Sequence, residues 1–305
     1  MTFSPRVTVT IPFYNKTSML LKAVESVRAQ SYPHWKLIIC DDAGPEPECA
    51  IEIEELGDSR IQYFRNSQNL GLAGNWNLCV EKAADTEFVV ILHSDDELAP
   101  NYLTEMLKFA DEHPEGSLYF CQPTIIDAES REIFSFVDRY KEVLIPRSQG
   151  ITRLNGDEGV SALMKGNFIC CPSVLYRKQS LPEGALFRSE LRCVPDWELS
   201  IRILLRGGSI LGIQKNLFRY RRHGTSVTDE TRINLRMFHE ELALRKETAS
   251  QTAERGWSNA YRSASQIRGI ILALGFFLLK DLVSFQLTHA TSKLRLGLKI
   301  LIGQA

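Results

Sequence analysis

The chain has 305 residues, of which 44% are hydrophobic and 24% charged, as in an ordinary folded globular protein. This length fits one large domain or two small ones, and the composition excludes a disordered chain, a collagen-like fibre and a protein with many membrane spans. The net charge of −1 gives no sign of a nucleic-acid partner, but it is uneven: residues 1–230 carry −7 and residues 231–305 carry +6. The asymmetry indicates two parts with different tasks.

The seven cysteines are odd in number, form no C-x-x-C pair and mostly lie in apolar runs, which predicts buried, reduced thiols. The N-terminal stretch lacks the charged start and apolar run of a signal peptide. We therefore expect a protein of the cytoplasm or of the cytoplasmic face of the membrane.

Strands and helices alternate along the first 125 residues. Short apolar runs predict five strands, and periodic apolar positions between them predict helices. Such alternation is typical of a parallel α/β sheet with right-handed crossovers. The expected strands are 7–13, 36–40, 60–64, 88–92 and 117–122, and the expected helices are 17–30, 75–84 and 100–113.

The alternation loosens after residue 125, and residues 126–155 are expected to form irregular strands and loops. A helix is predicted for 195–206, where Pro195 can begin it and two glycines can end it. Beyond residue 228 the pattern is helical. The remaining expected elements of the middle region are a helix at 157–165 and strands at 172–177 and 210–221.

Acidic residues follow two of the predicted strands. Ligands of such sheets bind beyond the carboxyl ends of the strands. The pair Asp41 and Asp42 could cap a turn there, or accept hydrogen bonds from a base or a ribose. The pair Asp95 and Asp96 follows a very apolar strand; it could lie in a surface turn or bind Mg²⁺ or Mn²⁺, which prefer oxygen ligands.

Two further polar residues stand outside these clusters. Asp196 lies at the start of a predicted helix, where an acid complements the helix dipole or could act chemically. His223 lies in a basic loop and could simply be solvated.

Six segments in order resemble the family 2 glycosyltransferases, over about residues 5–226. They are Val-Thr-Val-Thr-Ile-Pro-Phe-Tyr-Asn at 7–15, Ser-Val-Arg-Ala-Gln-Ser-Tyr-Pro at 26–33, Leu-Ile-Ile-Cys-Asp-Asp at 37–42, Asn-Leu-Gly at 69–71, Leu-His-Ser-Asp-Asp at 92–96 and Pro-Asp-Trp-Glu at 195–198. The resemblance implies the GT-A fold, a Rossmann-like, mostly parallel sheet flanked by helices, here with a C-terminal helical extension. The implied catalytic domain is 1–228, with a nucleotide-binding half of about 1–125 and an acceptor half of about 126–228, followed by a helical region at 229–305.

The resemblance also implies site roles. Tyr14 would stack on the base, Asp42 would accept from it, typically from uracil, and Asp196 would be the catalytic base. Asp96, with Asp95 and His223, would bind Mn²⁺ or Mg²⁺. The residues assigned to the nucleotide sugar are Pro12, Tyr14, Asn15, Asp41, Asp42, Asn69, Gly71, Asn75, His93 and Asp95.

The implied reaction is metal-assisted direct displacement, which inverts the anomeric carbon, from a nucleotide sugar, most often a UDP-sugar, to a hydroxyl of a glycan or lipid-linked glycan. The chain departs from the family in having His93 where an Asp is frequent, and it lacks the Gln-x-x-Arg-Trp motif of processive synthases, which favours single transfer. The loop 166–173 would border the acceptor, or form a core strand with a tight turn. A sugar-phosphate nucleotidyltransferase and a non-catalytic nucleotide-sugar-binding module are the alternatives; the first should have a Gly-rich loop after the first strand, where this chain has Pro-Phe-Tyr-Asn.

The longest apolar run, 269–279, has eleven residues, too few for a membrane span of about 20. Residues 257–305 contain six Lys/Arg and one Asp/Glu among many leucines. Such a basic, apolar-faced region could lie on an anionic membrane surface, form a homodimer interface, or pack against the catalytic domain. No nucleic-acid partner is expected.

Overall fold

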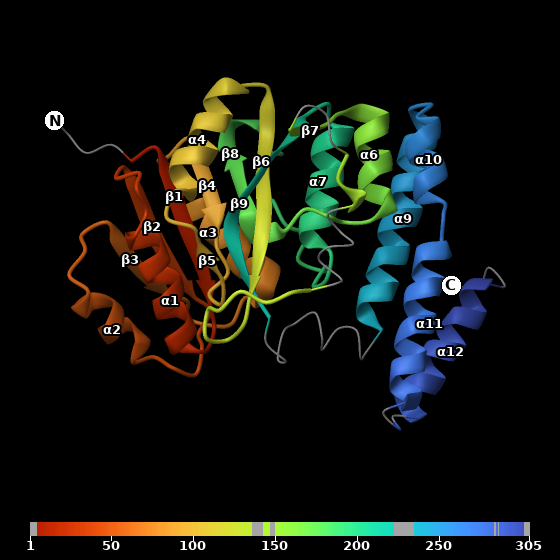
Figure 1. Cartoon of the computed structure of the whole chain (residues 1–305), viewed down its shortest axis with the longest axis horizontal. Helices are drawn as coiled ribbons and strands as arrows, with labels where there is room; N and C mark the ends of the chain where they lie inside the picture. Colours follow the sequence, from red (N-terminus) through yellow and green to blue (C-terminus); the bar gives the residue numbers. More distant parts are fainter. Residues whose placement is uncertain are drawn as a thin grey trace.

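The computed structural model describes residues 5–135, 143–146, 150–222, 235–283, 285 and 287–301. These residues form a nine-stranded sheet in the order β3-β2-β1-β4-β8-β6-β9-β5, with β7 paired to β9 (Figure 1). The strands β3, β2, β1 and β4 are parallel, whereas β8 is antiparallel to both of its neighbours. The strands are β1 (Val7–Phe13), β2 (Trp35–Asp41), β3 (Ile61–Arg65), β4 (Phe88–Ile91), β5 (Glu97–Leu98), β6 (Gly116–Ile126), β7 (Ile151–Leu154), β8 (Val174–Arg177) and β9 (Ser209–Arg221).

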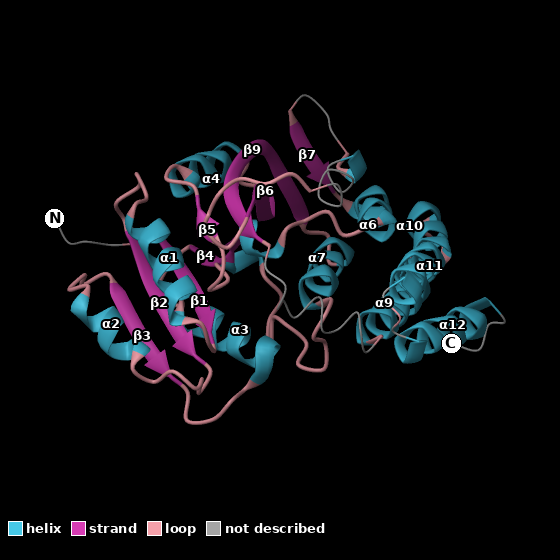
Figure 2. Cartoon of the chain, turned by 60° about the horizontal axis from the view of Figure 1, so that its bottom comes forward, coloured by secondary structure: helices cyan, strands magenta, loops and turns pink. Residues whose placement is uncertain are grey.

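Helices cover both faces of this sheet and continue beyond one end of it (Figure 2). The helices are α1 (Thr17–Arg28), α2 (Cys49–Glu55), α3 (Gly71–Lys82), α4 (Tyr102–Glu112), α6 (Gly156–Lys165), α7 (Pro195–Leu205), α9 (Arg236–Glu254), α10 (Ser258–Ala264), α11 (Arg268–Val283) and α12 (Leu287–Leu301). The predicted α/β fold with a C-terminal helical extension is therefore confirmed.

The alternation of side chains along β4 explains why its sequence is continuously apolar. Phe88 and Val90 pack in the cluster that contains α1 and α4, whereas Val89 and Ile91 pack in the cluster that contains α6 and α7. Successive side chains of a strand point to opposite faces, so a strand covered on both faces must be apolar at every position.

Most predicted elements lie within a few residues of the observed ones, but α2 and β5 were not predicted. The region 126–155, expected to be irregular, contributes β7 at the far side of β9. All seven cysteines are reduced thiols, as predicted; four are buried, and Cys170, Cys171 and Cys193 are half-buried.

The C-terminal helices divide into two groups. Leu244 of α9 and Ala260 of α10 belong to the same apolar cluster as α6 and α7. The hairpin of α11 and α12 has its own small core, which includes Ile270 and Leu296 and is joined by Phe238 of α9. No helix within the described residues is both long enough and apolar enough to cross a membrane.

Candidate active site

The strands β1, β2 and β4 end at one edge of the sheet. They are parallel, and the register pairs Phe13 with Asp41 and Thr10 with Ile91. The residues that follow each strand therefore meet at this edge, which is where α/β sheets of this kind bind ligands.

The loop after β1 presents Tyr14 to solvent. Its side chain is 48% exposed, Asn15 is exposed and Pro12 is half-buried. The loop rests on the turn after β2, where a Cβ on Gly44 would lie 1.7 Å from the carbonyl oxygen of Tyr14. Only glycine fits this close approach, so Gly44 allows the loop that carries Tyr14 to pack directly on the turn after β2. The sequence did not reveal this role.

Asp41 is fully buried and holds that turn together. Its Oδ1 accepts from the Gly44 N–H at 2.8 Å, and its Oδ2 accepts from the Tyr63 hydroxyl at 2.6 Å and from Arg65. Burial, together with the Asp41 carboxylate, raises the pKa of Tyr63, which keeps the phenol a donor. The carboxylate of Asp41 thus binds internal donors on both oxygens.

Asp42 occupies the space between β2 and the start of α3. Its Oδ1 accepts from the Leu70 N–H at 2.7 Å and from Asn66 Nδ2 at 3.0 Å, and its Oδ2 accepts from the Gly71 N–H at 3.0 Å. These N–H groups belong to the unpaired first turn of the helix, so Asp42 caps α3 from a distant strand.

The other residues predicted in this loop take part in the same network. Asn69 is exposed, and its Oδ1 also accepts from the Gly71 N–H, at 2.9 Å. Asn75 is buried and donates to the Cys40 carbonyl at 2.8 Å. The structure therefore brings the predicted residues of this loop together around the end of β2.

Three potential metal ligands follow β4. One ligand atom from each of His93, Asp95 and Asp96 lies within 4.8 Å of the other two. Asp96 is buried; its Oδ1 accepts from the Arg221 N–H at 2.8 Å, whereas its Oδ2 has no hydrogen-bond partner among the described residues. His93 Nε2 is also buried and has no hydrogen-bond partner in the described ranges, and the His93 ring lies 5.0 Å from that of Trp76.

The electrostatics of this cluster favour a cation. Burial, and then the Asp95 charge, raise the pKa of Asp96 well above its usual value, against the opposing effect of Arg221. Burial lowers the pKa of His93, so its imidazole is neutral and has a lone pair to offer. A divalent cation would neutralise the two carboxylates and give the buried Asp96 oxygen its missing partner, so the residues present fit such an ion.

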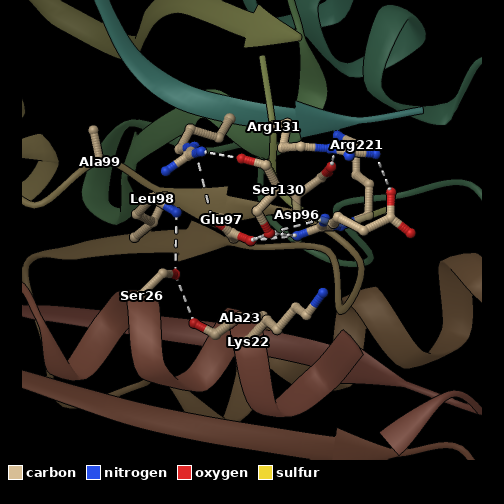
Figure 3. A network of polar contacts seen from close by, with 12 residues as sticks. Lys22, Ala23, Ser26, Asp96, Glu97, Leu98, Ala99, Ser130, Arg131 and Arg221 are labelled. Carbon is tan, nitrogen blue, oxygen red and sulfur yellow. Dashed lines mark hydrogen bonds and ion pairs between the residues drawn. The ribbon is translucent and has the colours of Figure 1, made fainter. Parts of the chain in front are cut away.

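Arg221, at the end of β9, fixes the backbone of this cluster and was not predicted (Figure 3). Its guanidinium donates to the Asp95 carbonyl at 2.7 Å, to Ser130 Oγ at 3.1 Å and to the Glu97 carboxylate. Ser130 Oγ in turn donates to Glu97 at 2.5 Å. One buried side chain therefore joins β9, the segment after β4 and the turn at residues 127–130.

Asp196 lies in the first turn of α7, which Pro195 begins. Its Oδ2 accepts from Asn167 Nδ2 at 3.1 Å, so the loop 166–173 contacts it. Burial raises the pKa of the Cys171 thiol, and the charges of Asp196 and Asp96 add to this effect. Both carboxylates thus raise the pKa of the same thiol. His223 lies outside the described residues.

Residues 8–181 match the family described as Glycosyl transferase family 2. The chain belongs to this family. The predicted family is therefore confirmed, and membership in it argues against a sugar-phosphate nucleotidyltransferase. The matched region includes the predicted site residues from Pro12 to Asp96, whereas Asp196 lies beyond it.

Curated relatives match over different lengths. Putative glycosyltransferase EpsH of Bacillus subtilis is 26% identical over 85% of this chain and 72% of its own length. Putative teichuronic acid biosynthesis glycosyltransferase TuaG of the same organism is 25% identical over 74% of this chain and 82% of its own. The chain spans only 41% of putative glycosyltransferase EpsE of B. subtilis and 14% of an uncharacterized protein of Sinorhizobium fredii.

The fold is similar to that of TarS from S. aureus. The structure of TarS 1–349 in complex with UDP-GlcNAc has a TM-score of 0.64 and 16% identity, over 98% of this chain and 92% of that one. The GT-A-like fold predicted for the chain is therefore confirmed, including the helices that follow the sheet.

Proposed function

We propose that this family 2 glycosyltransferase transfers a sugar from a UDP-sugar to a hydroxyl of a glycan or lipid-linked glycan, once per encounter, with inversion. The observation that carries the proposal is the cluster of His93, Asp95 and Asp96, in which the buried Asp96 Oδ2 has no hydrogen-bond partner within the part of the chain that the structure describes. TarS, which shares the fold, was solved in complex with UDP-GlcNAc, which supports a UDP-linked donor.

The exposed ring of Tyr14, with Pro12 and Asn15 beside it, is the proposed stacking surface for the uracil. Asp42 accepts three internal hydrogen bonds, and a carboxylate offers about four lone-pair sites, which leaves room for a base N–H. In our proposal Asp41 does not contact the nucleotide. It contributes indirectly, by holding the turn on which the Tyr14 loop rests.

Asp95 and Asp96 are the proposed metal ligands, with His93 as the neutral third donor and His223 as a further candidate. When bound, Mn²⁺ or Mg²⁺ would neutralise charge on the departing diphosphate. UDP affinity should rise with added Mn²⁺ in isothermal titration, and Asp96→Asn should remove the increase. Equal UDP affinity with Mn²⁺ and with EDTA would contradict this assignment.

Asp196 is the proposed base that takes the proton of the attacking hydroxyl, with Asn167 orienting its carboxylate. A positioned base contributes about 10²–10⁴-fold, so Asp196→Asn should lower turnover by this factor and leave UDP affinity unchanged. Glu158→Gln is the matched control, because Glu158 is an exposed first-turn acid of α6 and tests loss of the helix-dipole interaction alone. Near-normal turnover by Asp196→Asn would make the assignment wrong.

The donor sugar is best found with a panel of nucleotide sugars. The enzyme is incubated with each nucleotide sugar and Mn²⁺ in the absence of an acceptor, and the rate of donor hydrolysis shows which donor occupies the site. Preference for a GDP- or CMP-linked sugar over every UDP-sugar would contradict the proposed donor class.

We further propose that the catalytic domain extends over 1–228 and that α11 and α12, in the helical region 229–305, rest on an anionic membrane. Leu272, Phe276, Leu279 and Val283, spaced along one face of α11, are between 62% and 74% exposed. Asp281, the one acid in residues 257–305, pairs with Lys293 at 2.6 Å, so basic charge dominates around this face.

Flotation with liposomes that contain phosphatidylglycerol tests this placement on the full chain. Phe276→Asp should reduce binding, whereas Tyr261→Asp on α10, also exposed, should not. A wild-type chain that fails to float would contradict membrane binding. If it also elutes as a dimer that Phe276→Asp dissociates, this face of α11 is a homodimer interface instead.

A further inference from the structure

Side chains of α9 contact the chain around the start of α7, although α9 is far beyond the region matched by the family (Figure 1). Glu240 of α9 reaches the segment that leads into α7. Its carboxylate accepts from the Cys193 N–H at 2.7 Å and from the Arg192 N–H at 3.0 Å and 3.1 Å. Cys193 lies three residues before Asp196, so this contact is at the point where the helix that bears Asp196 begins.

The contact is buried and charged. Glu240 is 8% exposed and pairs with Arg236 Nε at 2.6 Å. Burial opposes its ionisation, but Arg236 and the two N–H groups outweigh this and lower the pKa of Glu240. An ionised carboxylate that receives main-chain N–H groups forms stronger hydrogen bonds than a neutral acceptor.

A second side chain of α9, that of Arg245, contacts the residue that follows Asp196 in the sequence. The Arg245 guanidinium lies 5.8 Å from the centre of the Trp197 ring, which directly follows Asp196. Arg245 is itself held by Glu241 at 2.9 Å and by the Ser263 carbonyl at 3.2 Å. The helix α9 therefore contacts the chain both before and after Asp196.

We propose that Glu240 is a positioning residue for Asp196: it fixes the start of α7, and so the place of the carboxylate, without touching the substrate. This inference rests on the proposed role of Asp196 as base. A misplacement of about 1 Å can cost about 10²-fold in rate. Loss of the Glu240 contact should therefore lower kcat while UDP affinity, which we assign to the residues after β1, β2 and β4, stays constant.

The test compares Glu240→Gln and Glu240→Ala with wild type in the release of UDP from UDP-GlcNAc with Mn²⁺. We expect kcat to fall about tenfold for Gln and further for Ala, with unchanged KM and UDP affinity. Glu247→Gln is the control, because Glu247 is also an acid of α9 that pairs with an arginine, Arg188. Glu247 is exposed, and its partner Arg188 lies eight residues before Asp196 and not at the start of α7. Near-UV circular dichroism establishes that each variant is folded.

A double variant separates this inference from the proposed function. Glu240→Gln should add no loss to Asp196→Asn, since a positioning residue acts only through the residue it positions. A folded Glu240→Gln enzyme with wild-type kcat, or a proportional change of kcat and UDP affinity, would overturn the inference. If Asp196→Asn itself is active, the base assignment fails instead.

Discussion

Replacing Arg221 by methionine should destabilise the protein far more than the same change at Arg219 on the same strand. Both arginines approach Glu97, and both donate to the turn that contains Ser130. The Arg221 side chain is 1% exposed, whereas that of Arg219 is 34% exposed. The two arginines thus differ in burial, and Arg221 also makes more side-chain hydrogen bonds than Arg219.

The expected magnitudes follow from this difference. Removing one partner of a buried ion pair leaves an uncompensated charge and costs about 3–5 kcal/mol. Removing the half-buried Arg219 side chain, which lies 3.7 Å from Glu97, should cost about 0.2–1 kcal/mol. Arg221→Lys should fall between, because an ammonium keeps the charge but cannot reach the Asp95 carbonyl, Glu97 and Ser130 together.

Urea unfolding followed by tryptophan fluorescence measures these free energies. In a double-mutant cycle, Arg221→Met should lower the free energy of unfolding much less in a Glu97→Gln background, because no buried carboxylate is then left without its partner. Equal destabilisation by Arg221→Met and Arg219→Met would refute the reasoning. Because Arg221 also fixes the Asp95 backbone and Asp96, Mn²⁺ affinity should fall about 10–100-fold in Arg221→Met, as for other residues that orient metal ligands.

Two further outcomes are expected. Gly44→Ala should lower both stability and UDP affinity, since its Cβ would lie 1.7 Å from the Tyr14 carbonyl oxygen, whereas Gly269→Ala, with open space around it, should change neither thermal melting nor UDP titration. The Thr17 hydroxyl and nearby N–H groups lower the pKa of Glu46, so its stabilisation is present above the usual carboxyl pKa of about 4.3 and lost as pH falls through the lowered value. The stability difference between wild type and Glu46→Gln should therefore be present at pH 7 and vanish in acid; a difference that is constant with pH would contradict this.

The sequence allowed prediction of the parallel half of the sheet because β1, β2 and β4 are short, mostly apolar runs that are buried at almost every position. Val7–Phe13 was predicted to the residue, since both of its faces are covered. The strand β5 has two residues and α2 has seven, of which only Cys49 and Ile53 are buried, so neither has a periodicity long enough to detect.

The site residues also differ in whether the sequence could predict them. The position of Asp95 and Asp96 is a local property, because it depends only on where β4 ends. Arg221 reaches Asp96 across 125 residues of sequence, and Glu240 reaches Cys193 across 47. Such partners depend on how distant elements pack, and a single arginine or glutamate in an otherwise ordinary pattern gives no local signal of it.

The two acidic pairs at the sheet edge look alike in sequence, but the hydrogen bonds separate them physically. Asp41 and Asp42 receive donors on all four carboxylate oxygens from their own chain, so they stabilise the fold without a ligand. Asp96 Oδ2 is buried and receives no donor from the residues that the structure describes, a deficit that typically costs about 1–3 kcal/mol. A ligand that supplies the missing partner recovers this cost only in the folded state, so cation binding and folding stability must be coupled at Asp96 and not at Asp41.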